Sequence, residues 1–255
     1  MKLGFIGTGK ITSSVISGIC KSKIKYSKIY ISPRNNKIAK TLKKKFKKII
    51  IAKTNQEIIN NSDWVFLSVT PIVGERIIKK LKFKSNQIVI SFISTITLSQ
   101  LRKMIGKRMI IIRAIPLPPI SLKEGPIPIC PPNRKVKKFF DHLGSTIEIK
   151  NEKLSINFWS TSGMMASYYN ILKVMSEWLA NKGIKKLDAQ KYITNLFLAL
   201  SKDAVMNSKK DLAILVKDSQ TPKGLNEQGL KVMSKKGTYK ILVKSLNDIH
   251  KRLSK

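Results

Sequence analysis

The sequence predicts an α/β fold in two parts, with strands alternating with helices up to residue 150 and helices alone after it. In the first part, short and nearly continuous apolar runs alternate with helical patterns, which is typical of a parallel sheet covered on both faces. From residue 151 onward only long helical periodicities remain. A chain of 255 residues is long enough for two modest domains, and we expect them at 1–150 and 151–255.

The first predicted strand, at residues 3–6, ends in a glycine turn that is followed by a helical pattern over 10–20. In a Rossmann-type βαβ unit, this order places the backbone N–H groups of the helix N-terminus against a pyrophosphate. Thr12 stands at the third small position of this fingerprint, and its branched side chain weakens the match. The residues expected to contact the nucleotide here are Gly7, Thr8, Gly9, Lys10 and Ile11.

The second predicted strand, at residues 28–31, ends in a loop that indicates which nucleotide binds. An NAD site usually has a carboxylate here to bind the ribose 2′-OH, and this loop has none. Ser32, Arg34 and Asn35 instead offer hydroxyl, guanidinium and amide groups, which suit a 2′-phosphate. The loop therefore favours NADP(H) over NAD(H). The alternative is a solvated basic loop in a chain where such loops are common.

The other elements of the first part follow in chain order. We expect strands at 48–52, 64–69, 87–93, 109–115, 127–130 and 146–149, and helices at 55–60, 72–81, 98–104 and 134–142. A cluster of prolines between 116 and 132 marks the exit from the domain. The densest lysine run, at residues 40–48, covers the outer face of the second helix and the approach to the third strand.

The second part is predicted to be entirely helical, over 154–180, 188–206, 210–216 and 226–250. We expect a break at Ser162-Gly163, a turn near Gly237, and Asp188 as the N-cap of its helix. About a hundred residues of this composition are marginal for standing alone. We therefore expect an obligate homodimer, or a higher homo-oligomer, that shares this helical core.

Composition limits the classes of function. The net charge is +36, but the lysines are dispersed and no nucleic-acid motif is present, so we expect salt-sensitive polyanion binding and no specific nucleic-acid partner. No apolar run has membrane-spanning length and no signal peptide is recognisable, which favours a cytoplasmic protein without membrane contact. Cys20, Cys130, His142 and His250 lack metal-ligand or triad spacing, so we expect no metal.

Seven motifs in order carry a resemblance. They are GFIGTGKI, ISPRN, SDWVFLSVTP, VISFISTITL, IIRAIPLPP, STSGMMASYY and SQTPKGLNEQGL. Over nearly its whole length the chain resembles the pyrroline-5-carboxylate reductase family. The resemblance implies NADPH-dependent reduction of a cyclic imine to proline, by a Rossmann domain followed by a helical dimerisation domain that is often assembled into higher oligomers.

On the cofactor side the resemblance extends to individual residues. Gly7, Gly9, Ser32 and Arg34 fall on family cofactor positions, as do Asn55 and the turn made by Val69, Thr70 and Pro71. The departure is Thr70, where the family usually has lysine.

On the substrate side the motifs differ. The family's SGSGPA becomes SGMMAS at 162–167, its SPGGTT becomes TPKGLN at 221–226, and its MPNTP becomes IPLPP at 115–119. Asn226 falls where the family places the hydroxyl that hydrogen-bonds the imine nitrogen, and an amide can still donate there. The resemblance implies substrate contacts for Glu152, Met164, Thr221, Lys223 and Leu225.

Two substitutions have open alternatives. Met164 and Met165 either enlarge an apolar substrate surface or are ordinary packing residues. Lys223 either pairs with a substrate carboxylate or faces solvent.

Three functions remain: a reductase of a cyclic imine, an NADP-binding regulatory protein without catalysis, and a polyanion-binding protein. A protonated imine is already an electrophile, so hydride transfer needs positioning more than a strong base. The lack of a catalytic lysine motif disfavours the β-hydroxyacid dehydrogenases, because Lys173 is the only candidate.

Overall fold

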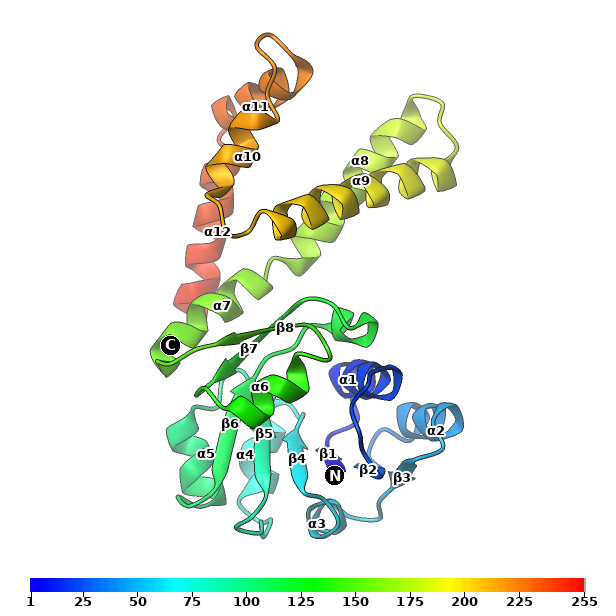
Figure 1. Cartoon of the computed structure of the whole chain (residues 1–255), viewed down its shortest axis with the longest axis vertical. Coiled ribbons are helices and arrows are strands. Elements are labelled where there is room, and N and C mark those ends of the chain that lie inside the picture. The colour runs from blue at the N-terminus through cyan, green and yellow to red at the C-terminus, as the bar shows by residue number, and fades with distance from the viewer. Residues whose placement is uncertain (255) are drawn as a thin grey trace. The chain divides into compact units, whose positions relative to one another are not determined.

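The computed structural model describes residues 1–254 and divides into two compact units. The first unit is Met1–Trp159 and the second begins at Ser160, within helix α7 (Ser155–Ser162). The domain boundary expected after residue 150 stays a prediction. Figure 1 shows the α/β unit and the helical unit, and we describe each by itself.

The first unit is built on one sheet in the order β3-β2-β1-β4-β5-β6-β7-β8. Its strands are β1 (Lys2–Ile6), β2 (Lys28–Ile31), β3 (Ile49–Ile51), β4 (Trp64–Leu67), β5 (Ile88–Ser91), β6 (Ile110–Ala114), β7 (Pro126–Cys130) and β8 (Ser145–Glu148). From β3 to β6 every ladder is parallel, and β1 pairs with both β2 and β4. The strand order therefore reverses between β1 and β4. From β1 to β3 the strands are added toward one edge of the sheet, and from β4 onward they are added toward the other edge.

The predicted parallel sheet is confirmed with one exception, because β6 and β7 pair antiparallel. The connection between them, through the 3-10 helix η1 (Pro118–Leu122), holds no α-helix. Parallel neighbours need a longer crossover, so this short and proline-rich link returns the chain antiparallel.

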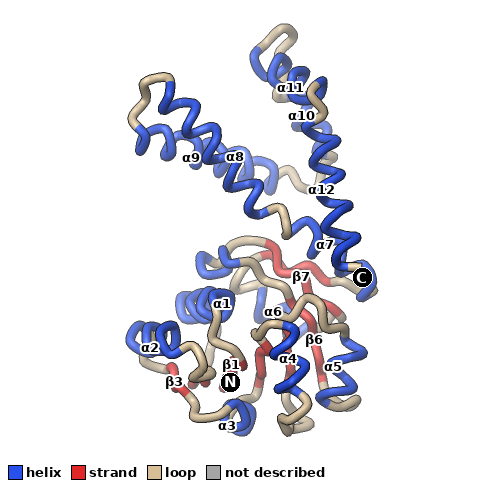
Figure 2. Tube along the Cα trace, turned by 180° about the vertical axis from the view of Figure 1, so that it is seen from behind, coloured by secondary structure: helices blue, strands red, loops and turns tan. Residues whose placement is uncertain are grey.

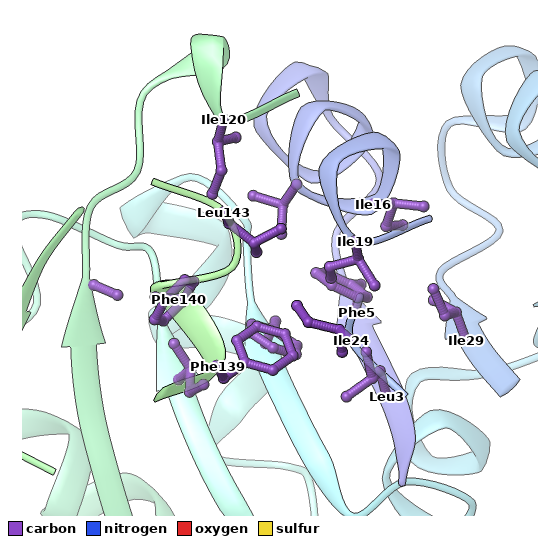
Figure 3. Close-up of a cluster of buried hydrophobic side chains, with 14 of the residues drawn as sticks. Leu3, Phe5, Ile16, Ile19, Ile24, Ile29, Ile120, Phe139, Phe140 and Leu143 are labelled. Carbon is purple, nitrogen blue, oxygen red and sulfur yellow. The ribbon is translucent and has the colours of Figure 1, made fainter. Parts of the chain in front are cut away.

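Helices connect the strands of the first unit (Figure 2). They are α1 (Lys10–Lys21), α2 (Asn36–Lys45), α3 (Asn55–Asn60), α4 (Pro71–Ile78), α5 (Leu98–Ile105) and α6 (Arg134–Phe140), followed by the short η2 (Glu152–Leu154). Leu3 and Phe5 of β1 pack into one core cluster with Ile16 and Ile19 of α1 and with residues of α2 and α6 (Figure 3). Phe5 stacks on Phe66, with ring centroids 4.4 Å apart. The alternation seen in the sequence thus becomes a sheet with helices on its faces.

The second unit continues as α8 (Met165–Asn181), α9 (Lys186–Met206), α10 (Leu212–Asp218), α11 (Leu225–Lys235) and α12 (Thr238–Leu253). The predicted break near Gly163 and the turn at Gly237, which has φ 76°, are confirmed. The prediction that Asp188 is an N-cap is wrong. Helix α9 begins two residues earlier with Lys185 as its N-cap, and Asp188 lies in the first turn, where a carboxylate favours the helix dipole.

The second unit buries few of its apolar residues. In α8 and α9 the buried apolar residues include Ala189 and Ile193, whereas Trp178 is 60% exposed and Met206 is 85% exposed. Exposed large apolar side chains also occur on α10, α11 and α12. Among residues 1–254, no helix is both long and apolar enough to cross a membrane.

Candidate functional site

The residues predicted to bind a nucleotide lie at the carboxyl ends of the parallel strands. Residues 7–11 follow β1, residues 32–35 follow β2, Asn55 begins α3 after β3, and residues 69–71 follow β4. All belong to the first unit, on both sides of the point where the strand order reverses. In open α/β sheets this is the edge at which ligands bind.

Gly7 is required by the backbone. Its φ is +100°, and a Cβ built on it would lie 2.2 Å from the carbonyl oxygen of Ser68. A side chain would therefore be strained and would collide with the chain that leaves β4. Gly7 lets the ends of β1 and β4 approach each other at the switch point.

Gly9 has no such internal reason to be glycine. Its φ is −94°, and within residues 1–254 a Cβ built on it would meet no atom within 4 Å apart from its two chain neighbours. It is the N-cap of α1, no side chain caps that helix end, and the first turn of α1 holds no acidic residue. The N-terminal end of α1 is therefore uncapped, and the space beside its N-cap residue is open. This cradle fits a pyrophosphate.

Thr12 fits this turn better than the fingerprint suggests. The residue is fully buried, and its Oγ1 donates to the Gly7 carbonyl oxygen at 2.8 Å. The same hydroxyl hydrogen-bonds Ser68 Oγ at 2.7 Å. Its branched side chain therefore ties the glycine turn to the end of β4 instead of preventing close packing, which corrects the expectation of a weakened match.

The loop after β2 is held from both sides. Thr8 Oγ1 donates to the Ser32 carbonyl oxygen at 2.7 Å, and Ser32 Oγ donates to Asn55 Oδ1 at 2.6 Å. Asn35 is the N-cap of α2, with its Oδ1 3.3 Å from the Ile38 nitrogen. Arg34 is exposed between these anchored residues. The loop thus presents a cation on a fixed backbone.

The turn after β4 is also open. Thr70 is the N-cap of α4 but its hydroxyl caps no helix N–H, and Pro71 occupies the first turn. Thr70 is exposed, and Val69 and Pro71 are half-buried. Lys10, at the start of α1, is exposed, and Ile11 is half-buried. These residues leave polar backbone and side-chain groups at the same edge as the glycine turn.

Glu152 is tied to the same edge further along the sheet. Its Oε1 accepts from the Leu98 backbone N–H at 2.8 Å and from Arg113 Nη1 at 2.5 Å. Leu98 begins α5 after β5, and Arg113 lies near the end of β6. Sequence reasoning missed Arg113, although a charge inside the apolar run MIIIRAI was a visible signal.

The remaining predicted substrate residues lie in the second unit. Residues 221–224 form a turn closed by a 2.7 Å bond from the Gly224 nitrogen to the Thr221 oxygen. Lys223 has φ 61° and its backbone N–H donates to Glu227 Oε2 at 2.6 Å. Glu227 also pairs with Lys231 at 2.7 Å. The hydrogen bond from Lys231 has the largest effect on the pKa of the Glu227 carboxyl, followed by the bond from the Lys223 N–H. Both lower this pKa below its usual value.

Asn226 and Leu225 open helix α11. Asn226 is exposed in the single chain, and its Nδ2 donates to the Ser219 carbonyl oxygen at 2.8 Å. This bond uses one of its two amide hydrogens and orients the group. Leu225 is 86% exposed, and Met164 is a half-buried residue at the N-cap of α8. Their roles toward a substrate stay predictions.

Other reactive groups offer no rival centre. Among residues 1–254, no three His, Cys, Asp or Glu side chains are grouped so that they could hold a metal ion. Cys20 and Cys130 are free, and burial raises the pKa of both thiols. A raised pKa keeps a thiol protonated and a poor nucleophile.

Two family models match the chain. Residues 2–95 match the model described as NADP oxidoreductase coenzyme F420-dependent, and residues 154–255 match pyrroline-5-carboxylate reductase dimerisation. The first match covers the glycine turn and the ends of β1 to β4, and the second covers the helical part.

Similar proteins match over the full length. Pyrroline-5-carboxylate reductase 2 of Bacillus subtilis is 21% identical over 98% of this chain and 93% of its own. Among solved structures, 1-pyrroline-5-carboxylate reductase from Streptococcus pyogenes has a TM-score of 0.84 at 23% identity, covering 99% of this chain and 98% of that one. The Plasmodium falciparum pyrroline carboxylate reductase with NADP bound has a TM-score of 0.82 at 21% identity, covering 99% and 97%. Over nearly its full length the chain is thus similar to pyrroline-5-carboxylate reductases, and its helical part matches the dimerisation model of that family.

Proposed function

We propose that the protein is a pyrroline-5-carboxylate reductase-like, NADPH-dependent reductase that transfers hydride to the C=N bond of a cyclic imine, pyrroline-5-carboxylate or a related imino acid. The observation that carries the proposal is the open cradle at Gly9. This glycine lies at the uncapped N-terminal end of α1, and packing among residues 1–254 gives no reason for a glycine there. The full-length similarity to pyrroline-5-carboxylate reductases supports the reaction class.

The coenzyme preference rests on the loop after β2. A 2′-phosphate is stabilised by a guanidinium and by hydroxyl donors, whereas a free 2′-OH is usually bound by a carboxylate. The loop has Arg34 exposed beside Ser32 and contains no acidic residue, and the first turn of α2 has none either. NADP(H) is therefore the favoured coenzyme.

The residues divide the work by position. The N–H groups at the start of α1 bind the pyrophosphate, and Gly7 keeps the turn tight enough to present them. Residues 69–71 border the coenzyme beside β4. A bound dihydronicotinamide supplies the hydride. On the substrate side, Asn226 retains one amide hydrogen that can be donated to the nitrogen of a neutral imine, and Glu152 offers a carboxylate to the protonated, cationic form.

The test is steady-state oxidation of NADPH with a panel of cyclic imino acids, repeated with NADH. We expect turnover with at least one five- or six-membered imino acid, and a higher kcat/KM with NADPH. Tight NADP binding by calorimetry with no turnover on any of them would support a regulatory protein instead, a candidate favoured by the altered sequences at 162–167 and 221–226. If NADPH and NADH both bind only weakly, the reductase and the regulatory protein are both contradicted.

The same proposal includes a homodimer or higher homo-oligomer formed through the helical unit. Exposed apolar side chains on α8 to α12 are more than an isolated unit of this size normally leaves in water. The match to a dimerisation model supports a second copy of the chain as the partner that covers this surface. Sedimentation at micromolar concentration should give at least the mass of two chains, and a stable monomer of 28.8 kDa would contradict it.

A further inference from the structure

One arginine lies inside the sheet of the first unit. Arg113 is 4% exposed and is flanked along β6 by Ile111, Ile112 and Ala114, which are all buried. Removing a guanidinium from water costs free energy, and an apolar residue at such a position is often as stable or more stable. The stability of the fold alone therefore does not explain why an arginine occupies this buried position.

The guanidinium joins two loops. Arg113 Nη1 donates to Glu152 in η2, and Nη2 donates to the carbonyl oxygen of Ser94 in the loop after β5. Its Cζ lies 5.7 Å from the ring centroid of Trp159, which is itself buried. Arg113 Nε is buried without a hydrogen-bond partner in the described chain. The fork is thus fixed by two acceptors and one aromatic face.

Glu152 is held by one oxygen only. Both of its hydrogen bonds, from Leu98 and from Arg113, reach Oε1. Within residues 1–254, Oε2 accepts no hydrogen bond, and 27% of the Glu152 side chain is exposed. The arrangement leaves one carboxylate oxygen free while the other is anchored.

The free oxygen of Glu152 lies on the side of the sheet where a Rossmann fold binds the nicotinamide half of a dinucleotide. In a Rossmann sheet the strands on one side of the switch point bind the adenosine half of a dinucleotide, and those on the other side bind the other half. Leu98 and Arg113 follow or end β5 and β6, on the side away from the loop after β2. A carboxylate there meets the part of the site where a substrate reacts.

We propose that Arg113 is a positioning residue that anchors Glu152 Oε1, so that Oε2 accepts a hydrogen bond from the N–H⁺ of the protonated imine. This inference rests on the proposed function. When hydride from the coenzyme adds to the imine carbon, the C=N π electrons move to nitrogen and cancel its charge. No proton is transferred in this step.

That charge balance predicts which kinetic constant changes. The iminium carries its full positive charge when bound and loses it as hydride arrives. Attraction to Glu152 is therefore stronger in the bound imine than in the transition state, so its loss should raise KM more than it lowers kcat. A hydrogen bond to a charged group is worth about 1.5–3 kcal/mol, or about 10- to 100-fold in KM.

The experiment is a double-mutant cycle of Glu152→Gln and Arg113→Met. Gln keeps an oxygen for Leu98 and Arg113 but places an NH₂ group at the Oε2 position. We expect each single variant to raise the imine KM about 10-fold or more, with kcat changed less than about threefold and NADPH affinity unchanged. Because Arg113 acts through Glu152, the two losses should not multiply. The imine KM of the double variant should lie within about threefold of the KM of the more impaired single variant. Arg102→Met, an exposed arginine of α5, is the matched control and should behave as wild type.

A second measurement separates positioning from folding. We expect wild type to be inhibited more strongly by a cyclic secondary amine than by its carbocyclic analogue, and both single variants to lose this discrimination. If Arg113→Met does not fold, Arg113→Lys replaces it and should lose part of the discrimination. Multiplicative losses in the double variant, or an unchanged KM, would overturn the role of Arg113. A wild-type chain that reduces no imine would instead overturn the proposed function together with it.

Discussion

The two units solve the burial problem differently. In the first, β1, β2, β4, β5 and the helices around them place their apolar residues in a continuous core, and the candidate coenzyme site lies on the edge of a fold complete in itself. In the second, Trp178 and many other large apolar side chains are exposed in the single chain. The difference leads us to expect that the first unit can bind a coenzyme without a partner, whereas the helical unit needs a partner to cover its apolar side chains.

The largest expected effect comes from removing the glycine that shapes the first unit. Gly7→Ala places a Cβ 2.2 Å from the Ser68 carbonyl oxygen at a φ of +100°. The strain of about 1–3 kcal/mol should lower Tm and distort the turn, so NADPH affinity should fall by more than about 100-fold. Calorimetry and thermal unfolding measure both, and wild-type affinity in this variant would break the comparison on the coenzyme side.

The second prediction concerns the exposed face of the helical unit. Trp178→Lys puts a charge where we expect a partner subunit, so the oligomer should dissociate at concentrations at which wild type remains associated. NADPH affinity should change little, because the first unit carries its own core. Sedimentation velocity gives the mass, and Lys173→Ala on the same helix, an exposed residue that pairs with Glu177, is the control. An unchanged mass would place the interface elsewhere.

The third prediction concerns coenzyme choice. Arg34→Ser removes the exposed cation after β2 while leaving the Ser32–Asn55 hydrogen bond in place. We expect the ratio of kcat/KM for NADPH to that for NADH to fall about 10-fold, since a charge-assisted hydrogen bond contributes about 1.5–3 kcal/mol. An unaltered ratio would mean that Arg34 is only a solvated residue of a basic loop.

The smallest effect is expected at the turn before α11. The pKa of Glu227 is lowered by Lys231 and by the Lys223 N–H, so its interactions stabilise the fold above the usual carboxyl value of 4.5. That contribution is lost as the pH falls through the lowered pKa of the folded state. Glu227→Gln should therefore have a slightly lower Tm than wild type at pH 7, and this difference should shrink below pH 4.5. A Tm difference that grows in acid would contradict the pairing.

Much of the fold could be predicted because apolar periodicity and glycine turns are local signals. The strand at Lys28–Ile31 and the helix at Asn55–Asn60 lie where the sequence predicts them. Thr12 was undervalued because its benefit is a hydrogen bond to Ser68, which only the fold brings near. Asp188 was misplaced because a carboxylate is favourable both at the N-cap and in the first turn.

The substrate side could be predicted less well, because its contacts are not local. The pairing of Arg113 with Glu152 joins residues 39 positions apart. The residues from Thr221 to Asn226 are exposed or half-buried in the single chain, so their use depends on what covers them.

The most direct test of a coenzyme lying across the carboxyl edge of the sheet is NADPH binding by Gly9→Val. Apart from the two chain neighbours of Gly9, no atom of residues 1–254 lies within 4 Å of the Cβ this change adds, so thermal stability should stay close to that of wild type. The branched side chain would occupy the cradle at the N-terminus of α1, so NADPH affinity measured by calorimetry should fall at least about 10-fold. A variant that unfolds like wild type and still binds NADPH with wild-type affinity would show that no pyrophosphate lies there.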